Sequence, residues 1–586
     1  LVTWAIGVDL DDDNDDGEDS DTRAWIHGDV IHSRPIALNY GDRDNPAVIV
    51  YYGANDGMLR AINGNQEDDA FNHAPGEELW AFMPPEFYGE IKRLRVNTET
   101  VKFPATGPDA GSTGTRKAYG MDGVITAFEG DAVVGVTAET DLKYIYATMR
   151  RGGRAIYAFD VSDPNDPGAH LAWKKGCDAS GCSTDTADGE GWTDIGETWS
   201  SANVAYVNGR TNPVLIMGGG YDECEDVDNG SGNENHACTS ANTGDHIYVM
   251  DAISGELLKV FDTLRAVPGG VTIVPITDPT NANPTPDIAF AYATDTGGNV
   301  YRISGPLVDA DGDASTPGNA TVIGSTLPDK WVLTRIASFG CDTIGTACDA
   351  NRKFLFGPDV VRSLSDSAIF RILVGSGDRE KPIINYSATT DVDNYFYSFI
   401  DQPLASEAWL DVDTDCGVDV ICHGLMEQVT TVEVATGAGR EVQIVVPDGV
   451  DLAAAKGYKL KLAETEQVVT GALVVGDIAN FSTHVPYDVS KDNDPDADIC
   501  QNKLGNATTY NIGFENAEGE GIDIFTGGLV PTPVAGLVEL CEGGICTKEP
   551  FCIGCGGENS PIGGGDAGAE SSYEQSKGKV YWNIEQ

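Results

Sequence analysis

Short runs of β-branched and aromatic residues recur along the chain, and each is broken by a Gly- or Asp-containing turn before a second apolar run. In the first example, Val48–Gly53 leads through the turn Ala54–Gly57 into Met58–Ile62. Asn-Asp-Gly and Gly-Gly sequences supply the positive φ angles that tight hairpins need. The pattern therefore predicts β-hairpins, while helical periodicity is sparse.

Five further copies of this pattern follow. They lie at 144–161, 214–258, 288–303, 370–400 and 472–513. A sheet built on one hairpin cannot bury both of its faces, so repeated units stack around an axis. Six copies and a unit closed by both termini, with Lys579–Asn583 as the closing strand, predict an all-β, modified seven-bladed β-propeller with long decorated loops. A row of β-sandwiches is the alternative, because sandwiches contain similar short strands.

The spacing of the copies divides the chain into three parts. We expect propeller blades and an acidic calcium-type loop in 1–402, and an insertion between blades in 403–470. Residues 471–586 would hold the last blade or blades and the closing strand. Within them, the Cys- and Gly-rich stretch 541–572 predicts an irregular loop stapled by disulfides.

The net charge of the chain limits the classes of partner that it can bind. Lys and Arg number 37 against 92 Asp and Glu, which gives a formal net charge of −55. Nucleic acid is excluded because phosphate binding needs clustered Lys and Arg. An anionic membrane surface would repel the chain, and no apolar run is long enough to span a bilayer, so we expect no membrane insertion.

Thirteen cysteines indicate an oxidising compartment, because most fall in close pairs inside loops. The pairs are Cys177/Cys182, Cys224/Cys238, Cys341/Cys348, Cys416/Cys422, Cys541/Cys546 and Cys552/Cys555. Cys500 is left over. A reduced protein with scattered thiols and a zinc knot from the last four cysteines are the alternatives. The chain begins with Leu1, so we expect a targeting segment upstream and export through the periplasm.

One acidic run near the start has the pattern of a calcium loop. Asp12, Asn14 and Asp16 place oxygen ligands at alternate positions, and Gly17 lets the chain turn around an ion. Asp19 or Asp21 would close the shell. The final Glu of an EF-hand is absent, because Arg23 stands there. A solvated acidic linker is the competing interpretation.

Two other acidic runs alternate carboxylates in the same way. They predict further Ca²⁺ ligands at Asp309, Asp311 and Asp313, and at Asp492, Asp494 and Asp496. A solvated loop is the competing interpretation for each run.

Sequence signatures of catalysis are absent. The chain has no Gly-x-Ser-x-Gly, His-Glu-x-x-His or Gly-x-x-x-x-Gly-Lys motif, and we interpret the neighbouring His27 and His32 as structural. The stretch from Ala54–Gly57 to Gly76–Trp80 resembles the tryptophan-docking element of quinoprotein dehydrogenases, which bind pyrroloquinoline quinone with calcium beneath an adjacent-cysteine disulfide. This chain has no Cys-Cys dipeptide, and we expect no enzyme. A periplasmic quinoprotein oxidoreductase is the alternative.

An ordered set of short motifs covers most of the chain and resembles the PilY/PilC-type type IV pilus biogenesis factors. The matching stretches are Gly28–Pro35, Tyr52–Leu59, Gly76–Pro84, Gly152–Val161, Tyr248–Leu258, Gly297–Arg302 and Gly457–Leu462. The resemblance implies a modified seven-bladed propeller. It also implies a tip adhesin that supports pilus extension and opposes retraction, with Ca²⁺ as the switch.

The calcium loop that the resemblance implies precedes the strand with Gly297–Arg302. Here Asp278, Asn281, Asn283 and Asp287 stand at or near its ligand positions, and Pro279 occupies the first one. Fewer carboxylates predict weaker calcium binding, so the loop at Asp12 would hold the tighter ion. The chain has no Arg-Gly-Asp triplet.

The resemblance also implies partners and a location. We expect the chain to contact minor pilins in a pilus-tip complex and a host or abiotic surface ligand. The expected location is extracellular, at the pilus tip or outer cell surface. A structural cell-surface propeller without pilus partners is the remaining alternative.

Overall fold

The computed structural model describes residues 1–555 with internal exceptions. The exceptions are 43–44, 67–69, 103–113, 132–140, 166–167, 169, 208, 228–242, 276–287, 309–318, 324–325, 343–350, 406–409, 411–419, 437–438, 489–503, 525–526 and 543–544. Residues 556–586, with the predicted closing strand, lie outside the description.

Strands dominate the described part of the chain, as predicted. The α-helices there are short: α1 (Val2–Ala5), α2 (Ile91–Val96) and α3 (Ser387–Thr390). Single 3-10 turns are η1 (Ala70–Asn72), η2 (Pro85–Phe87), η3 (Glu223–Asp226), η6 (Pro328–Lys330) and η8 (His423–Leu425). Among the described residues, no helix combines the length and apolar character needed to cross a membrane.

The first three sheets are antiparallel and follow chain order. The first contains β1 (Ile36–Asn39), β2 (Val48–Gly53), β3 (Leu59–Asn63) and β4 (Glu78–Phe82). The second contains β7 (Ile125–Asp131), β8 (Asp141–Thr148), β9 (Arg154–Asp160), β10 (His170–Asp178) and β11 (Gly181–Cys182). The third contains β12 (Asn203–Ala205), β13 (Val214–Gly218), β14 (His246–Asp251) and β15 (Leu257–Asp262). A separate pair is formed by β5 (Val101–Lys102) and β6 (Thr115–Arg116).

Later sheets are larger and less regular. The fourth contains β16 (Thr272–Pro275), β17 (Ile288–Thr294), β18 (Asn299–Val308), β19 (Asn319–Thr321), β20 (Val332–Ser338) and β24 (Ile421–Cys422). The fifth starts with β21 (Asp359–Arg362), β22 (Phe370–Gly375), β23 (Tyr395–Asp401) and β27 (Gly457–Lys461). It continues through β25 (Glu427–Thr436), β26 (Gly439–Val445), β32 (Gly519–Ile524), β31 (Asn506–Gly513), β30 (Ile478–Val485), β28 (Gln467–Val468) and β29 (Leu473–Val475). The last pair is β33 (Val534–Glu542) and β34 (Ile545–Ile553).

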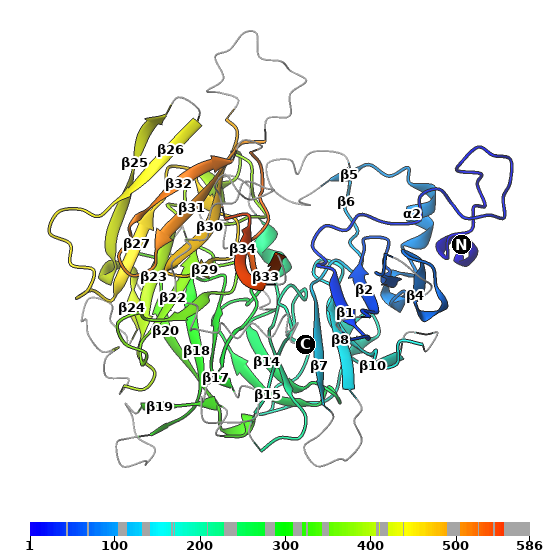
Figure 1. The fold of residues 1–586 in the computed structure, drawn as a ribbon, viewed down its shortest axis with the longest axis horizontal. Coiled ribbons are helices and arrows are strands. Elements are labelled where there is room, and N and C mark those ends of the chain that lie inside the picture. The colour runs from blue at the N-terminus through cyan, green and yellow to red at the C-terminus, as the bar shows by residue number, and fades with distance from the viewer. Residues whose placement is uncertain are drawn as a thin grey trace, which may run out of the picture.

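The sheets follow one another around the molecule in chain order, from blue through green to orange, as a propeller requires (Figure 1). One strand contacts the next in the order β1, β7, β12, β16, β21, β29 and β33, and this series runs from the first sheet to the last pair. A ring of seven blades remains a prediction, because the expected closing strand lies outside the described residues.

Five of the six predicted hairpins are confirmed as neighbouring strands. The prediction for 472–513 was wrong, because β29 and β31 both pair with β30 and not with each other. Val48–Gly53 is β2, and it pairs with β3 in the antiparallel register Tyr51↔Ala61. Alternate residues of β2 are buried, which is the period expected of a strand with one face in the core. Gly57 has a φ of 89° in the intervening turn, a conformation that glycine adopts at little cost.

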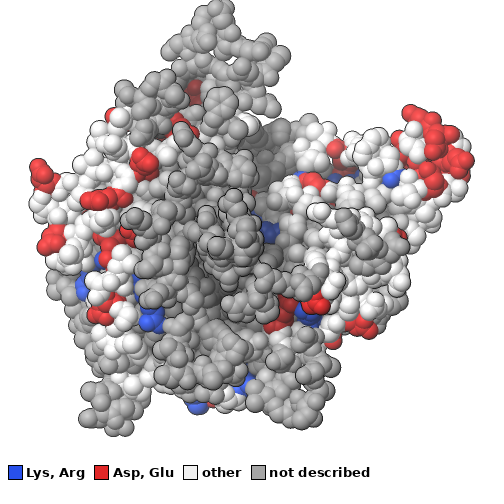
Figure 2. All heavy atoms as spheres, in the orientation of Figure 1, with Lys and Arg blue, Asp and Glu red and all other residues white. Residues whose placement is uncertain are grey.

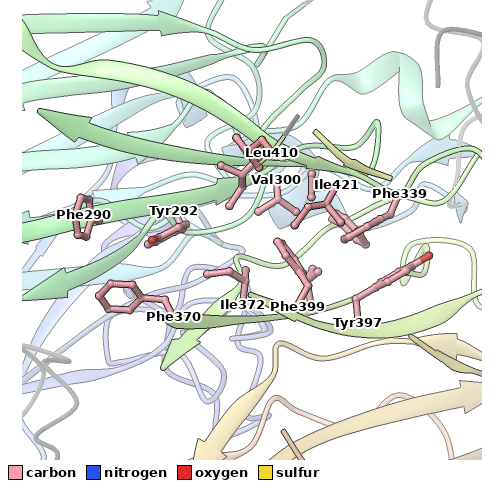
Figure 3. Close-up of a cluster of buried hydrophobic side chains, with 14 of the residues drawn as sticks. Phe290, Tyr292, Val300, Phe339, Phe370, Ile372, Tyr397, Phe399, Leu410 and Ile421 are labelled. Carbon is pink, nitrogen blue, oxygen red and sulfur yellow. The ribbon is translucent and has the colours of Figure 1, made fainter. Parts of the chain in front are cut away.

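Apolar side chains from facing sheets fill the space between them. Between the fourth and fifth sheets, Phe339 stacks on Tyr397 with ring centroids 4.3 Å apart, and Phe290 meets Phe370 edge to face at 5.8 Å. Figure 3 shows these side chains pointing toward one another with Ile372 and Phe399 between them. Aromatic pairs of this kind add to the free energy of burying their surface, so each sheet is stabilised mainly by its neighbours.

Two of the predicted disulfides are present among the described residues: Cys177–Cys182 joins β10 to β11, and Cys552–Cys555 joins the end of β34 to the residue two positions beyond it. Cys224, Cys341 and Cys422 are also disulfide-bonded, while their predicted partners Cys238, Cys348 and Cys416 lie outside the described residues. Cys500 lies outside them too.

The stretch 541–572 requires a correction. Its first part is not an irregular loop, because β33 and β34 pair antiparallel from Val534↔Ile553 to Glu542↔Ile545. Pairing places Cys541 opposite Cys546 and satisfies backbone groups that a loop would leave to solvent. Within 403–470, β27 pairs with β23 and β25, and β25 pairs with β26, so the range contributes strands to the fifth sheet.

Candidate functional site

The acidic N-terminal segment forms a closed loop. Asp9 N–H donates to the carbonyl oxygen of Asp21 at 2.8 Å, and Arg23 N–H donates to that of Gly7 at 2.8 Å. Asp9 itself is fully buried, and its carboxylate accepts the N–H of Asp13 at 2.9 Å. The sequence pattern did not assign Asp9 a role. Here this residue organises the loop from inside.

Three of the predicted calcium ligands meet across this loop. The Asn14 amide donates to Asp16 Oδ2 at 3.0 Å and to Asp21 Oδ2 at 3.3 Å. Asp12 Oδ1 accepts the N–H of Gly17 at 3.1 Å, which closes the turn. Asp12 and Asp15 both have positive φ, as a chain that wraps around a small centre requires.

One oxygen of this group is buried without a partner. Asp21 Oδ1 has no hydrogen bond among the described residues, and an unsatisfied buried carboxylate oxygen costs free energy. Rotation of the Asn14 amide would turn its oxygen toward Asp16 and Asp21. The donor set is then entirely oxygen, the ligand type that Ca²⁺ prefers, so the residues fit a calcium ion.

The loop projects from the body of the molecule. Figure 2 shows acidic side chains gathered at the projecting N-terminal end of the view, where the predicted ligands Asn14 and Asp16 are exposed and Asp12 is half-buried. Arg95 of α2 binds Asp11 through two hydrogen bonds of 2.7 and 2.8 Å and lowers the pKa of that carboxyl. This contact attaches the loop to the first sheet's flank.

The remaining predicted calcium ligands lie outside the described residues. They are Asp278, Asn281, Asn283, Asp287, Asp309, Asp311, Asp313, Asp492, Asp494 and Asp496.

The motif stretch Gly28–Pro35 docks against the first hairpin turn. Gly28 N–H donates to Asp56 Oδ2 at 3.1 Å, and Ser33 Oγ accepts the N–H of Gly53 at 2.8 Å. A Cβ at position 28 would collide with the Asp56 main chain, so glycine is required for this approach. His32 lies 2.6 Å from Asp122 through Nδ1, consistent with a structural interpretation.

Turns from four sheets meet in a buried network of charges that we call the turn network: Arg150, Arg151, Glu225, Asp226, Lys353, Asp378, Glu380 and Lys381. Arg151 forms a bidentate pair with Asp226 at 2.8 and 2.9 Å, and its Nη2 donates to Glu380 Oε2 at 2.9 Å. Because Arg151 follows β8 and Glu380 follows β22, the contact joins sheets that are not neighbours in the chain.

The other half of the turn network is equally buried. Lys353 Nζ lies 2.9 Å from Glu225 Oε2 and 3.1 Å from Asp378 Oδ2. Burial opposes the ionisation of Asp378, but the charges of Lys353 and Lys381 lower its pKa. Burial likewise opposes the ionisation of Glu380, and Arg150 with Arg151 holds its pKa well below the usual range. The network is therefore ionised and paired, and nothing in the sequence spacing predicted it.

Aromatic rings cover one side of these charges. Trp199 stacks on Tyr221 with centroids 4.1 Å apart, and the Arg150 guanidinium lies 3.8 Å above the Trp199 ring. Trp80 of the tryptophan-docking element packs between Tyr51 and Phe159, at 5.8 and 6.0 Å. Both tryptophans thus act in packing.

Sheets that follow one another in chain order, with long loops between them, place the fold in the β-propeller class, and comparison with known proteins gives the family. The model of the PilY1 beta-propeller domain matches residues 37–436, more than half of the chain. The chain belongs to this family.

Individual relatives agree with this assignment. The chain is 25% identical over 382 residues to the type IV pilus biogenesis factor PilY1 of Pseudomonas aeruginosa, covering 61% of this chain and 27% of that protein. A PilY1 homolog of Xylella fastidiosa is 26% identical over 221 residues, covering 34% of this chain and 14% of that protein. The chain thus spans about a quarter or less of the length of these relatives.

Solved structures include the crystal structure of the C-terminal domain of P. aeruginosa PilY1, with a TM-score of 0.49 and 17% identity. That match covers 86% of this chain and 92% of the domain. A quinohemoprotein alcohol dehydrogenase from Pseudomonas putida has a TM-score of 0.30 and 11% identity, covering 75% of this chain and 61% of that one.

Proposed function

We propose that this chain is the propeller domain of a type IV pilus biogenesis factor that acts at the pilus tip, where it binds minor pilins and an external surface without catalysing a reaction. The match to the PilY1 propeller family over residues 37–436 carries this proposal. The projecting acidic loop provides exposed surface for such contacts.

Calcium is the second part of the proposal. Asp12, Asn14, Asp16 and Asp21 hold one Ca²⁺ in the N-terminal loop. The buried Asp21 Oδ1, which has no hydrogen bond within the described part of the chain, supports this assignment. The ion stabilises the loop because the folded loop binds it better than the unfolded chain does. Calcium bound there would then modulate pilus extension and retraction.

Deletion of this domain from the organism that carries it tests the pilus role. We expect loss of surface pili by electron microscopy and loss of surface motility, with recovery when the intact coding sequence is restored. Normal piliation and motility in the deletion strain, with the remaining protein present, would contradict the proposal.

Metal analysis of the purified chain tests the calcium part separately. Elemental analysis should find bound calcium, and a chelator should make the segment 7–23 sensitive to protease before it lowers the melting temperature of the sheets. Asp21→Asn should lose this ion, whereas Asp448→Asn, which removes the same charge from an exposed turn, should keep it. Equal calcium content in both variants would show that the acidic loop does not hold the ion and is only solvated surface.

A further inference from the structure

A second group of cation-binding side chains lies where the segment between the second and third sheets meets β14. Glu190 and Asp194 belong to that segment, and His246 is the first residue of β14. The ligand atoms of these three side chains all lie within 4.8 Å of one another. One imidazole nitrogen and two carboxylate oxygens therefore converge on a single point.

Main-chain hydrogen bonds fix these positions. Gly244 N–H donates to the carbonyl oxygen of Asp194 at 2.6 Å, and Gly219 N–H donates to that of His246 at 2.6 Å. Trp192, between the two acidic ligands in the chain, stacks on Tyr248 with centroids 4.8 Å apart and planes 7° from parallel. The three side chains are thus brought together by a rigid framework.

The imidazole is buried and lacks a hydrogen bond on one side. His246 is 7% exposed. Its Nδ1 lies 3.1 Å from Asp245 Oδ1 in an ion pair whose geometry is not that of a hydrogen bond among the described residues. Native proteins rarely leave buried polar atoms without a hydrogen bond, because each costs free energy.

Tyr248 lies beside His246 on β14, with ring centroids 5.9 Å apart. Tyr248 is fully buried, and its Oη has no hydrogen-bond partner in the described part of the chain. The hydroxyl is therefore a further buried polar group near the imidazole, and a ligand or a water held by one would satisfy it.

Negative charge around the imidazole exceeds the nearby positive charge. Besides Asp245, Asp262 Oδ1 lies 3.2 Å from His246 Nε2. Arg154 is close, but its guanidinium donates to main-chain oxygens, including that of Thr193 at 2.7 Å. A divalent cation would balance the carboxylates that Arg154 leaves uncompensated.

We propose that Glu190, Asp194 and His246 bind one divalent transition-metal ion of the zinc class. An imidazole nitrogen disfavours Ca²⁺ and Mg²⁺, which take oxygen ligands, and a mixed nitrogen and carboxylate set suits Zn²⁺. Tetrahedral zinc with bonds of ~2.1 Å spaces its ligands about 3.4 Å apart. Closing from 4.8 Å requires a small movement, which the exposed side chain of Glu190 can make.

The bound ion would fasten the inter-sheet segment to the third sheet. Among the described residues, the hydrogen bonds of Glu190 are those of its main-chain bridge to Ala187. The site is separate in residues and ligand type from the calcium loop, so it does not depend on the proposed pilus function.

Zinc titration of the full chain tests this site. The protein is stripped with a chelator, supplied with excess Ca²⁺ to fill oxygen-only sites, and titrated with Zn²⁺ by calorimetry. We expect one zinc ion per chain, and Co²⁺ in its place should give a visible ligand-field spectrum. Glu190→Gln should weaken zinc binding on the order of 10–100-fold. Glu256→Gln, which changes an exposed glutamate in the turn between β14 and β15, should bind zinc like the wild type.

His246→Asn removes the nitrogen ligand, with near-ultraviolet circular dichroism as the check on folding. If it misfolds, Glu190→Gln at the surface still decides the result. Zinc binding that Glu190→Gln and Glu256→Gln leave equally strong, binding that Ca²⁺ abolishes, or no stoichiometric binding at all would overturn the proposal.

Discussion

Arg302 and Asp401 form an ion pair in which Nη1 donates to Oδ1 at 2.8 Å and both side chains are fully buried. Arg302 lies in β18 and Asp401 ends β23, so the pair joins the fourth sheet to the fifth. Tyr292 donates its hydroxyl to the other Asp401 oxygen at 2.8 Å. The last residue of the motif stretch Gly297–Arg302 is thus an inter-sheet anchor.

Removing one partner of this anchor should be costly. Asp401→Asn removes the buried carboxylate charge that pairs with the Arg302 guanidinium, and we expect a loss of about 3–5 kcal/mol in the free energy of unfolding. Denaturant unfolding of the variant measures this. The double variant Arg302→Met/Asp401→Leu should recover much of the loss, and a double variant as unstable as the sum of its parts would contradict the ion-pair interpretation.

Glu380→Gln should weaken the contact between the second sheet and the fifth. The change removes the charge that both Arg150 and Arg151 contact, and we expect a loss of about 3–5 kcal/mol. Glu256→Gln, on the surface of the third sheet, serves as the matched control with a change below about 0.5 kcal/mol. Equal melting temperatures for the two variants would argue against the turn network as a stabilising element.

Acid should destabilise the protein through His423. Burial, followed by the positive charges of Arg352 and Lys459, lowers the pKa of His423 to about 3. A histidine in the unfolded chain has a pKa of about 6.5. Below pH ~6.5 the unfolded state binds the extra proton, so this stabilisation is complete above that pH and declines as the pH falls toward 3. Unfolding of the wild type and His423→Gln at pH 7 and pH 5 should show the larger fall in the wild type. An equal loss of stability between pH 7 and pH 5 in both proteins would show that His423 does not cause the acid sensitivity.

Gly28→Ala should loosen the motif stretch from the first hairpin. The new methyl group would collide with the Asp56 main chain, and overpacking of this kind costs about 1–3 kcal/mol. Gly89→Ala is the control, because a Cβ there meets open space. Hydrogen exchange at Gly28 and Gly53, whose N–H groups bond across this contact, should accelerate only in the first variant. Unchanged exchange would mean that the stretch adapts without cost.

The sequence predicts local structure well and long-range chemistry poorly. Val48–Gly53 and Tyr395–Ile400 were predictable as strands because alternation and turn residues act within a few positions. The joining of β26 to β32 into one long sheet was not, because neither strand carries a mark of its partner. Asp12, Asn14 and Asp16 form a recognisable pattern in the chain, whereas Glu190 and His246 come together only through the fold.

The contact between Arg151 and Glu380 bears on how the molecule comes apart. A ring in which each sheet touched only its neighbours could unravel from one end, as repeat arrays do. Here Arg151, which follows β8 of the second sheet, pairs directly with Glu380, which follows β22 of the fifth. Unfolding of the first sheet therefore leaves this ion pair intact. A pulling force applied at the N-terminus should therefore meet its main resistance at the Arg151–Glu380 ion pair, after the acidic loop and the first sheet have unfolded.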